Sequence, residues 1–340
     1  MENTQNLLSI VHLKKYFPVS GGIFQRKRFL KANEDVSFDI KAGETFSLVG
    51  ESGSGKSTLG RTVLGLYKPT SGKVVYYGKE GRGVELTALS EKEFRPLRKD
   101  LQIIFQDPYS SLNPRMTVGQ IIEEGVATQG LYKRGSEAMR EYIFSVLEKC
   151  GLQKEAIQRY PHQFSGGQRQ RVCIARALAV KPKFIVCDEC VSALDASVQS
   201  QILNLLTELK EKENLTYLFI SHDLSVVRYV SDRVGVMYLG DMAEIGEAEE
   251  VFKNPRHPYT IALLASAPSK NKKEEIVLKG NVPSPVSPPS GCKFHTRCFM
   301  AKECCTKLVP PLKDIGGGHC VACHFAEVST REKRNLAKKI

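Results

Sequence analysis

The octapeptide GESGSGKS at residues 50–57 constrains the fold more than any other part of the chain. It lies between a short apolar run, TFSLVG, and a helical pattern, STLGRTVLGLYK. Its glycines allow backbone N–H groups to point inward around phosphate groups. Lys56 can reach the β- and γ-phosphates of a nucleotide, and the Ser57 hydroxyl can ligate Mg²⁺. The sequence therefore predicts a phosphate-binding loop at the start of a helix, where the helix N-terminus favours anions.

Apolar runs that alternate with helical patterns define the fold class. Residues 36–40 (VSFDI) alternate apolar and polar side chains, and residues 101–105, 183–189 and 216–223 have the apolar character of buried parallel strands. Helical spacing dominates residues 115–160. Strands that alternate with helices predict an α/β fold with a parallel sheet, and 340 residues are enough for two or three domains.

Charge and hydropathy indicate where such a chain works. No window contains 18 consecutive apolar residues, and the N-terminus lacks a basic and then apolar signal peptide, so a cytoplasmic protein is expected. The formal net charge is +12, but the Lys and Arg residues are scattered apart from the terminal run REKRNLAKKI. This distribution favours a solvated basic surface near a membrane over a nucleic-acid-binding surface.

Two adjacent carboxylates follow the apolar run FIVC. Asp188 is placed to hold the Mg²⁺ shell, and Glu189 is placed to accept a proton from an attacking water as general base. Adjacent side chains at a strand end diverge, so the two acids can serve different partners. Without the phosphate loop, the simpler interpretation would be that both acids cap the next helix.

Four further pieces complete the pattern. Gln106 ends the strand LQIIF, SGG at 165–167 opens a helix, SALD occupies residues 192–195, and His222 follows the strand TYLFIS. The Gln106 amide can touch Mg²⁺ or water, and His222 can contact a γ-phosphate. A lone glutamine or histidine is more often structural, and only the order of all these motifs is specific.

This order of motifs resembles the ATPase subunit of an ATP-binding-cassette (ABC) transporter over roughly residues 7–260. The resemblance implies a RecA-like α/β core with a helical subdomain near residues 110–170. It also implies that two such subunits close head to tail, with ATP between Lys56 of one and Ser165–Gln168 of the other. An aromatic residue stacks on adenine in this family. Phe17 is the best match and Tyr16 the alternative, unless both are ordinary core residues.

The resemblance assigns the site residues one by one. Glu189, His222 and Gln106 are the expected catalytic residues. The residues expected to bind nucleotide are Phe17, Gly50, Ser52, Gly53, Gly55, Lys56, Ser57, Thr58, Gln106, Ser165, Gly166, Gly167, Gln168, Asp188 and Asp195. Mg²⁺ is expected on Ser57, Gln106 and Asp188.

Several segments are similar to the ATPase subunits of bacterial oligopeptide and dipeptide importers, in particular to the subunit lettered F. These segments are VGESGSGKSTLGR, IIFQDPYSSLNPRMTVGQII, RYPHQFSGGQRQR and NPRHPYT. The similarity implies a peripheral ATPase on the cytoplasmic face of the membrane that powers peptide import. Its implied partners are a related D-type ATPase subunit, two transmembrane permease subunits and an extracellular peptide-binding protein, without nucleic acid. Cys190 stands where the family usually has proline.

Six of the ten cysteines lie between residues 291 and 323. In a reducing compartment a clustered set favours metal binding over disulfides. The family often carries such a motif after a proline-rich linker, and the resemblance implies a [4Fe–4S] cluster held by Cys292, Cys298, Cys305 and Cys323. The long gaps between the first three favour the cluster, whereas the C-x₂-C pair of Cys320 and Cys323 keeps Zn²⁺ open as the alternative, and disulfides or free thiols remain a third possibility. The expected role is structural.

The expected division of the chain follows from these assignments. Residues 1–258 form the ABC ATPase domain, 259–290 a proline-rich linker, 291–330 the iron–sulfur segment and 331–340 a basic tail. Because the linker is dense in proline, the cysteine segment is expected to be remote from Lys56 and Glu189, and ATP binding is expected to survive loss of the cluster.

Two other functions remain compatible with these motifs. One is a cytosolic ABC ATPase that works on nucleic acid or ribosomes, although such proteins usually carry two cassettes in one chain. The other is a transporter ATPase for a different cargo, such as nickel, glutathione or antimicrobial peptides.

Overall fold

The computed structural model describes residues 6–19, 28–78, 81–266 and 280–337. The chain divides into two compact units. Unit 1 comprises Met1–Lys41, Thr45–Ala88 and Ser221–Ile340, and unit 2 comprises Ala42–Glu44 and Leu89–Ile220. The phosphate loop and the cysteine-rich segment therefore belong to the same unit, although more than 200 residues separate them in the sequence.

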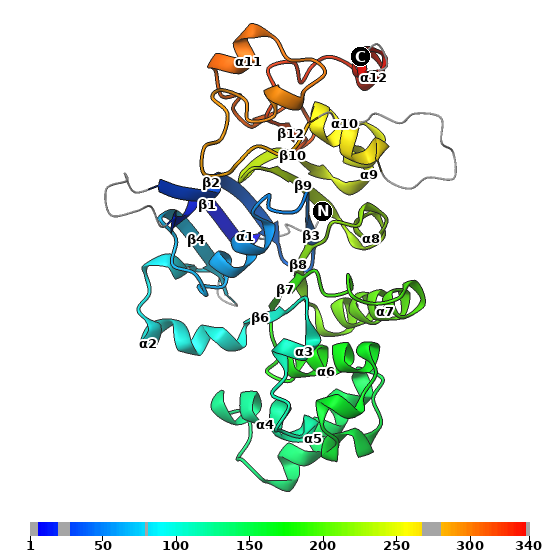
Figure 1. The fold of residues 1–340 in the computed structure, drawn as a ribbon. Coiled ribbons are helices and arrows are strands. Elements are labelled where there is room, and N and C mark those ends of the chain that lie inside the picture. Colours follow the sequence, from blue (N-terminus) through cyan, green and yellow to red (C-terminus); the bar gives the residue numbers. More distant parts are fainter. Residues whose placement is uncertain (1–5, 20–27, 79–80, 267–279, 338–340) are drawn as a thin grey trace. The chain divides into compact units, whose positions relative to one another are not determined.

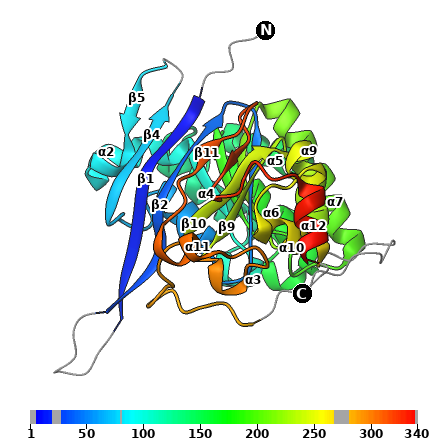
Figure 2. The same ribbon diagram turned by 90° about the horizontal axis from the view of Figure 1, so that it is seen from above.

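Unit 1 contains an antiparallel sheet in the order β2-β1-β4-β5 (Figures 1 and 2). Its strands are β1 (Asn6–Val19), β2 (Arg28–Lys41), β4 (Ser71–Tyr77) and β5 (Gly83–Glu85). The alternation expected in VSFDI is present, because Val36, Phe38 and Ile40 are buried whereas Asp39 is exposed.

A second run of strands in unit 1 has the order β11-β12-β10-β9-β3. These strands are β3 (Thr45–Val49), β9 (Arg233–Tyr238), β10 (Asp241–Glu247), β11 (Lys313–Asp314) and β12 (Cys320–Val321). Strand β3 pairs with β9 in parallel, and β10 pairs with β9 and with β12 antiparallel. The cysteine segment thus extends the sheet that carries the phosphate loop.

The core of unit 1 joins these distant segments. Val49, the last residue of β3, belongs to the same buried cluster as Tyr238, Tyr259 and Phe294. Phe294 is only 2% exposed, and Cys292 and Cys298 pack against the same cluster. The cysteine segment is therefore part of this core, which the scarcity of large apolar residues in its sequence did not predict.

Helices surround the sheets of unit 1. They are α1 (Lys56–Val63), η1 (Leu86–Ala88), α8 (Leu224–Val230), α9 (Ala248–Lys253), α10 (Pro258–Ala265), η5 (His295–Arg297), α11 (Glu303–Lys307) and α12 (Thr330–Ala337). Helix α12, drawn in red, packs beside α10 in both ribbon views (Figures 1 and 2). Within the expected basic tail, Lys333 is fully buried and its ammonium donates to the Arg256 carbonyl at 2.5 Å.

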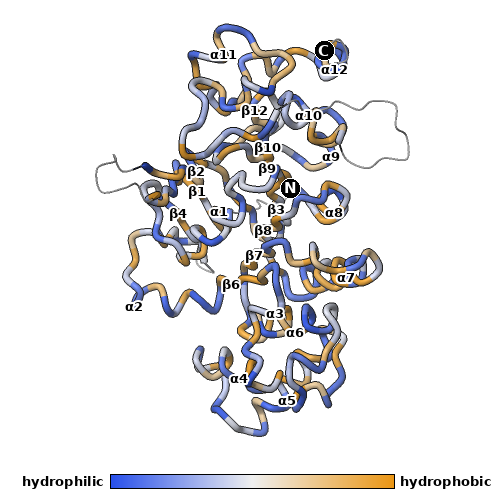
Figure 3. The backbone as a smooth tube through the Cα atoms, in the orientation of Figure 1, coloured by the Kyte–Doolittle hydropathy of each residue, from blue (hydrophilic) through white to orange (hydrophobic). Residues whose placement is uncertain are grey.

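Unit 2 combines three parallel strands with a helical region. The strands β6 (Leu101–Ile104), β7 (Phe184–Asp188) and β8 (Thr216–Ile220) pair in the order β8-β7-β6 and are parallel, as predicted. The helices are α2 (Glu91–Phe94), η2 (Arg95–Lys99), α3 (Pro108–Ser111), α4 (Val118–Thr128), α5 (Glu137–Lys149), η3 (Lys154–Gln158), η4 (Pro161–Gln163), α6 (Gly166–Leu178) and α7 (Ala196–Glu213). Along α7, hydrophobic and hydrophilic positions alternate in Figure 3, as expected when one helix face is buried.

The expected linker at 259–290 contains regular structure at its start. Residues 258–265 form α10, whose buried face includes Tyr259, and residues 280–290 contain neither helix nor strand. Residues 267–279 of the linker and 338–340 of the tail lie outside the described residues. No helix in the described part of the chain is long and apolar enough to cross a membrane.

Candidate nucleotide site and cysteine pocket

The phosphate loop follows β3 and ends in α1, as the sequence predicted. A Cβ at Gly50 would lie 2.2 Å from the Met237 carbonyl oxygen, and one at Gly55 would lie 2.1 Å from the Ala32 carbonyl oxygen. Both glycines also have positive φ, 148° and 102°. The loop therefore fits its surroundings only with glycine at these two positions.

Lys56 lies inside this loop. Its ammonium donates to the Gly50 carbonyl at 2.7 Å, to the Glu51 carbonyl at 3.0 Å and to the Ser54 hydroxyl at 3.3 Å. Asn33 of β2 donates to the Gly55 carbonyl at 3.1 Å. The loop and its lysine are thus held in one arrangement, with a positive charge where a phosphate would bind.

The remaining loop residues have mixed exposure. Ser52 and Gly53 are exposed, whereas Ser57 and Thr58 are half-buried in the first turn of α1. Ser221, just before His222, donates its backbone N–H to the Leu48 carbonyl at 3.2 Å. Within unit 1, this bond ties the segment that carries His222 to the strand that precedes the loop.

The two candidate adenine-stacking residues differ in their surroundings. The Tyr16 hydroxyl donates to the Glu34 carboxylate at 2.9 Å, and burial together with this carboxylate raises the pKa of Tyr16 to about 12. Phe17 is half-buried and meets the Tyr67 ring edge-on at 5.4 Å. The hydrogen bond to Glu34 fixes the Tyr16 ring, so Phe17 is the better candidate for stacking on adenine.

Unit 2 holds the predicted carboxylates. Asp188 ends β7 and is 1% exposed, and Glu189 has a positive φ of 50°. The Gln106 amide donates to Glu189 Oε2 at 2.9 Å, a contact that sequence reasoning missed because 83 residues separate the pair. An uncommon backbone conformation is compatible with a functional position for Glu189, and the amide fixes the orientation of its carboxylate.

The SGG motif of unit 2 forms a capped helix start. The Ser165 hydroxyl accepts from the Gln168 N–H at 3.4 Å, and the Gln168 side chain accepts from the Ser165 N–H at 3.0 Å. Ser165 and Gln168 are exposed, with Gly166 and Gly167 half-buried between them. This is the reciprocal capping box, and it presents a helix N-terminus at the surface.

Asp195 also caps a helix. Its carboxylate accepts from the Ser197 hydroxyl at 2.6 Å and from the Val198 N–H at 3.0 Å, and these hydrogen bonds lower the pKa of Asp195. Its local role at the start of α7 is therefore structural, and its predicted contact with nucleotide remains a prediction.

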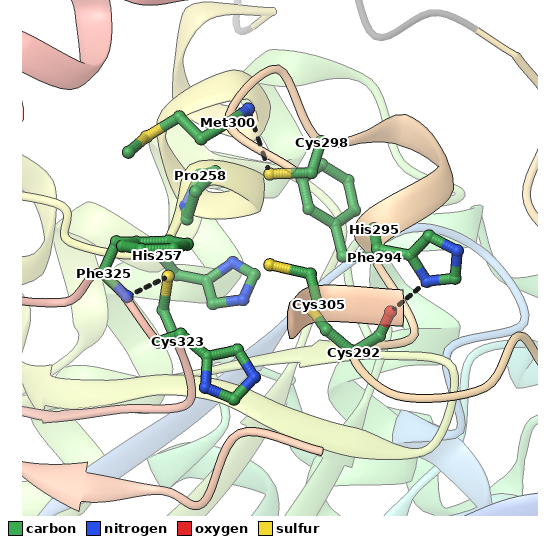
Figure 4. Close-up of a pocket in the computed structure, with 11 residues that line it drawn as sticks. His257, Pro258, Cys292, Phe294, His295, Cys298, Met300, Cys305, Cys323 and Phe325 are labelled. Carbon is green, nitrogen blue, oxygen red and sulfur yellow. Dashed lines mark hydrogen bonds between the residues drawn. The ribbon is translucent and has the colours of Figure 1, made fainter. Parts of the chain in front are cut away.

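The four cysteines predicted as cluster ligands line one pocket of unit 1 (Figure 4). Cys292, Cys298, Cys305 and Cys323 surround it together with His257, Phe294 and Phe325. Cys304 and Cys320 are absent from this lining. Of the six clustered cysteines, the four that the family resemblance implies as ligands line this pocket and the other two do not.

Of the four cysteines that line the pocket, Cys305 is buried and Cys292, Cys298 and Cys323 are half-buried. Burial raises the pKa of Cys292 to about 11 and that of Cys298 to about 12. Backbone N–H groups of Met300 and Phe325 point at the sulfurs of Cys298 and Cys323, each at 3.4 Å. Among the residues that the structure describes, no three His, Cys, Asp or Glu side chains are arranged around a single metal ion. The four thiols instead surround a pocket.

A buried glutamate of β10 connects the start of α10 with the cysteine-rich segment. Glu244 of β10 is fully buried and accepts from the backbone N–H groups of Arg256 and His257 at 2.6 and 2.9 Å, and the His319 ring lies 2.7 Å from Glu244 Oε1. Burial lowers the pKa of His257 to about 4, so this imidazole is neutral. No sequence motif indicated this network, since its members are spread over 75 residues.

Comparisons with known proteins agree with this arrangement. The family model for ABC transporters matches residues 33–192, and the model for the oligopeptide/dipeptide transporter C-terminal region matches residues 243–305. The oligopeptide transport ATP-binding protein AppF of Bacillus subtilis (strain 168) is 51% identical over 330 residues, which covers 95% of this chain and 98% of that protein.

Solved structures of ABC cassettes share the fold. The cassette MJ0796, in a dimeric post-hydrolysis state bound to ADP and Pi, is 29% identical with a TM-score of 0.62 and covers 71% of this chain and 98% of its own. The transporter component cbiO1 from Clostridium perfringens is 28% identical with a TM-score of 0.60 and covers 73% of this chain and 91% of its own.

These matches define an ABC-type ATPase. The chain belongs to the ATP-binding proteins of ABC transporters, and within them to the group that carries the oligopeptide/dipeptide transporter C-terminal region. The resemblance predicted from the motifs is therefore confirmed, as is the ABC fold.

Proposed function

We propose that this chain hydrolyses ATP on the cytoplasmic face of a membrane to power the import of oligopeptides or dipeptides. The phosphate loop, in which Lys56 is held by three oxygens, is the observation that carries this proposal. The similarity to AppF along nearly the whole of both chains supports peptides as the cargo.

The family resemblance assigns a chemical role to residues of each unit. In unit 1, Lys56 stabilises the charge on the β- and γ-phosphates, with the glycine-bounded loop around them. In unit 2, Glu189 accepts the proton of the attacking water, and the Gln106 amide holds its carboxylate in place. Ser57, Gln106 and Asp188 would hold Mg²⁺, which would neutralise the phosphate charge.

Replacing Glu189 by Gln tests the proton acceptor. The amide keeps the size of the side chain but cannot accept the proton, so nucleotide affinity should stay within about twofold while turnover falls about a hundredfold or more. Equilibrium binding and phosphate release measure the two effects. Wild-type turnover in Glu189→Gln would show that another group is the base.

The ATPase unit is a dimer with a related D-type chain, bound to two permease subunits and served by an external binding protein. The exposed capping box at Ser165 and Gln168 supports a dimer, since it offers a helix N-terminus to a nucleotide held by a partner chain. The isolated chain should be a poor ATPase, and coexpression with its partners should raise turnover. Full activity of a dilute monomer would exclude the composite site.

The cysteine pocket fits an iron–sulfur cluster. Its donor set consists of four thiols from one segment, two of which face backbone N–H groups that stabilise thiolates. Cys292, Cys298, Cys305 and Cys323 would hold a [4Fe–4S] cluster, which would add cross-links to the segment. Anaerobic protein should contain about four iron and four sulfide per chain. One zinc per chain without iron would assign the pocket to Zn²⁺.

A further inference from the structure

Glu51, the second residue of the phosphate loop, is held by two side chains from the far end of the sequence. Its backbone N–H donates to the Tyr259 hydroxyl at 2.8 Å. Its carboxylate accepts two hydrogen bonds from the Arg297 guanidinium, at 2.6 and 3.0 Å. These partners lie 208 and 246 residues later in the chain.

The pair with Arg297 has the geometry of a strong interaction. Two parallel N–H groups meet the two carboxylate oxygens, which fixes direction as well as distance. The Arg297 side chain is only 5% exposed and the Glu51 side chain 25% exposed, so water screens the pair less than a surface ion pair. The Tyr238 hydroxyl lies 3.4 Å from the same guanidinium and helps to orient it.

Glu51 also contacts the lysine that binds phosphate. Its carbonyl accepts from the Lys56 ammonium at 3.0 Å and from the Ser54 N–H at 3.2 Å. A shift of Glu51 therefore changes both the course of the loop and the position of Lys56. Arg297 and Tyr259 thus hold the side chain and the backbone N–H of Glu51, and Lys56 and Ser54 hold its carbonyl.

Arg297 belongs to the turn between Cys292 and Cys298, two residues that line the cysteine pocket, although Arg297 itself is not part of the lining. Arg297 is the last residue of η5, between Cys292 and Cys298, and its backbone N–H donates to the Phe294 carbonyl at 3.0 Å. Phe294 lines the pocket and packs against Tyr238 and Tyr259, with ring centroids 5.2 and 5.3 Å apart. One short turn of chain thus forms the pocket wall and reaches the phosphate loop.

We propose that Arg297 is a positioning residue of the nucleotide site, through which the conformation of the Cys292–Cys298 turn sets nucleotide affinity. This inference rests on the proposed binding of ATP by the phosphate loop. It replaces the expectation that the cysteine segment is remote from Lys56 and that nucleotide binding is independent of it. The proline-rich stretch does not separate the two regions, because η5 folds back onto Glu51.

The first experiment is a double-mutant cycle in the full-length protein. The Kd of a non-hydrolysable ATP analogue is measured by calorimetry for wild type, Arg297→Met, Glu51→Gln and the double variant. Each single substitution should raise the Kd about three- to tenfold, and the double variant should bind no more weakly than the weaker single variant. Arg297→Lys, which keeps the charge but loses the paired geometry, should recover part of the affinity.

Lys302→Met is the matched control. Lys302 is a cation of the same segment whose ammonium lies 4.6 Å from the centroid of the Phe325 ring. Its removal should leave the Kd within about twofold of wild type. An equal effect of Lys302→Met and Arg297→Met would overturn the inference, since general weakening of the segment would then explain both.

The second experiment perturbs the pocket itself. Cys298→Ser, which alters the pocket wall next to Arg297, should raise the nucleotide Kd, whereas Cys304→Ser, outside the pocket lining, should not. An unchanged Kd in Cys298→Ser would remove the link between pocket and loop.

The outcomes separate this inference from the function on which it rests. A wild-type protein that fails to bind the analogue would refute the proposed ATP site. A wild-type protein that binds, together with additive or silent Arg297 and Glu51 substitutions, would refute only the positioning role. If Arg297→Met does not fold, Glu51→Gln carries the same test, since it keeps the side-chain shape and removes only the charge.

Discussion

The phosphate loop and the cysteine pocket belong to the same unit, but they are built in different ways. The loop consists of eight consecutive residues, and its shape depends on glycines and on carbonyl groups that hold Lys56. The pocket collects side chains from residue 257 to residue 325, and its walls depend on the packing of Phe294 and the paired strands β10 and β12. The loop is therefore continuous in sequence and is held at Glu51 by Tyr259 and Arg297, whereas the pocket exists only when the whole C-terminal segment has folded.

This difference predicts that substitutions in the loop and substitutions in the pocket have different effects on the rest of unit 1. A change in the loop should remove nucleotide binding and leave the pocket intact. A change in the pocket should disturb its own segment and reach the loop through Arg297. The four predictions that follow are arranged from the largest expected effect to the smallest.

Lys56→Ala should give the largest loss. The substitution removes the cation that faces the phosphates, and turnover should fall about a hundredfold or more. The iron content of the protein should stay close to wild type, because the hydrogen bonds from the Lys56 ammonium to Gly50, Glu51 and Ser54 lie within the loop. Loss of iron in this variant would show that the pocket depends on the loop.

Cys305→Ser should remove most of the iron, and Cys304→Ser should not. The two residues are adjacent in α11, but only Cys305 lines the pocket. Iron and sulfide analysis of anaerobic protein, with ultraviolet–visible spectra, measures the difference. The reverse result would keep the cluster and overturn the ligand assignment.

Phe294→Ala should destabilise the protein by about 3–5 kcal/mol, the usual cost of removing a buried aromatic ring. The ring is 2% exposed and contacts Tyr238, Tyr259 and His257. Leu308→Ala is the control in the same segment, because Leu308 is 59% exposed, and its effect should stay within about 0.5 kcal/mol.

Denaturant unfolding monitored at the C-terminal segment compares these two variants. Equal stability of Phe294→Ala and Leu308→Ala would mean that the segment is not part of the core of unit 1.

The difference between a loop of consecutive residues and a pocket of distant residues also explains how much of the structure the sequence predicted. The loop, the strands β6, β7 and β8, and the helix start at Ser165 follow from short-range patterns, which neighbouring residues determine. The family resemblance implied the four cysteines that line one pocket of the structure, and their role as metal ligands stays a prediction.

The long-range contacts could not be predicted. The hydrogen bond from Gln106 to Glu189 spans 83 residues, and the ion pair of Arg297 with Glu51 spans 246. The proline-rich stretch suggested that the cysteine segment lies far from the phosphate loop. Proline content predicts that a linker is stiff, but it does not predict where the chain after the linker packs. Strand β12 was also missed, because a two-residue strand pairs through its backbone and leaves no periodic signal.

The smallest effect is expected at Phe17, the candidate for stacking on adenine. Phe17→Ala should raise the Kd for ATP about five- to tenfold, because one base-stacking surface is lost. Tyr16→Phe should leave it unchanged, because that hydroxyl serves Glu34. Inorganic tripolyphosphate makes the phosphate contacts of ATP without the base. Its Kd, measured by competition, should therefore be the same in wild type, Phe17→Ala and Tyr16→Phe. If Phe17→Ala instead weakened tripolyphosphate as much as ATP, the ring would act on the shape of the phosphate loop. The loop would then depend on β1 as well as on Asn33, Tyr259 and Arg297, and the contrast between a loop that is continuous in sequence and an assembled pocket would weaken.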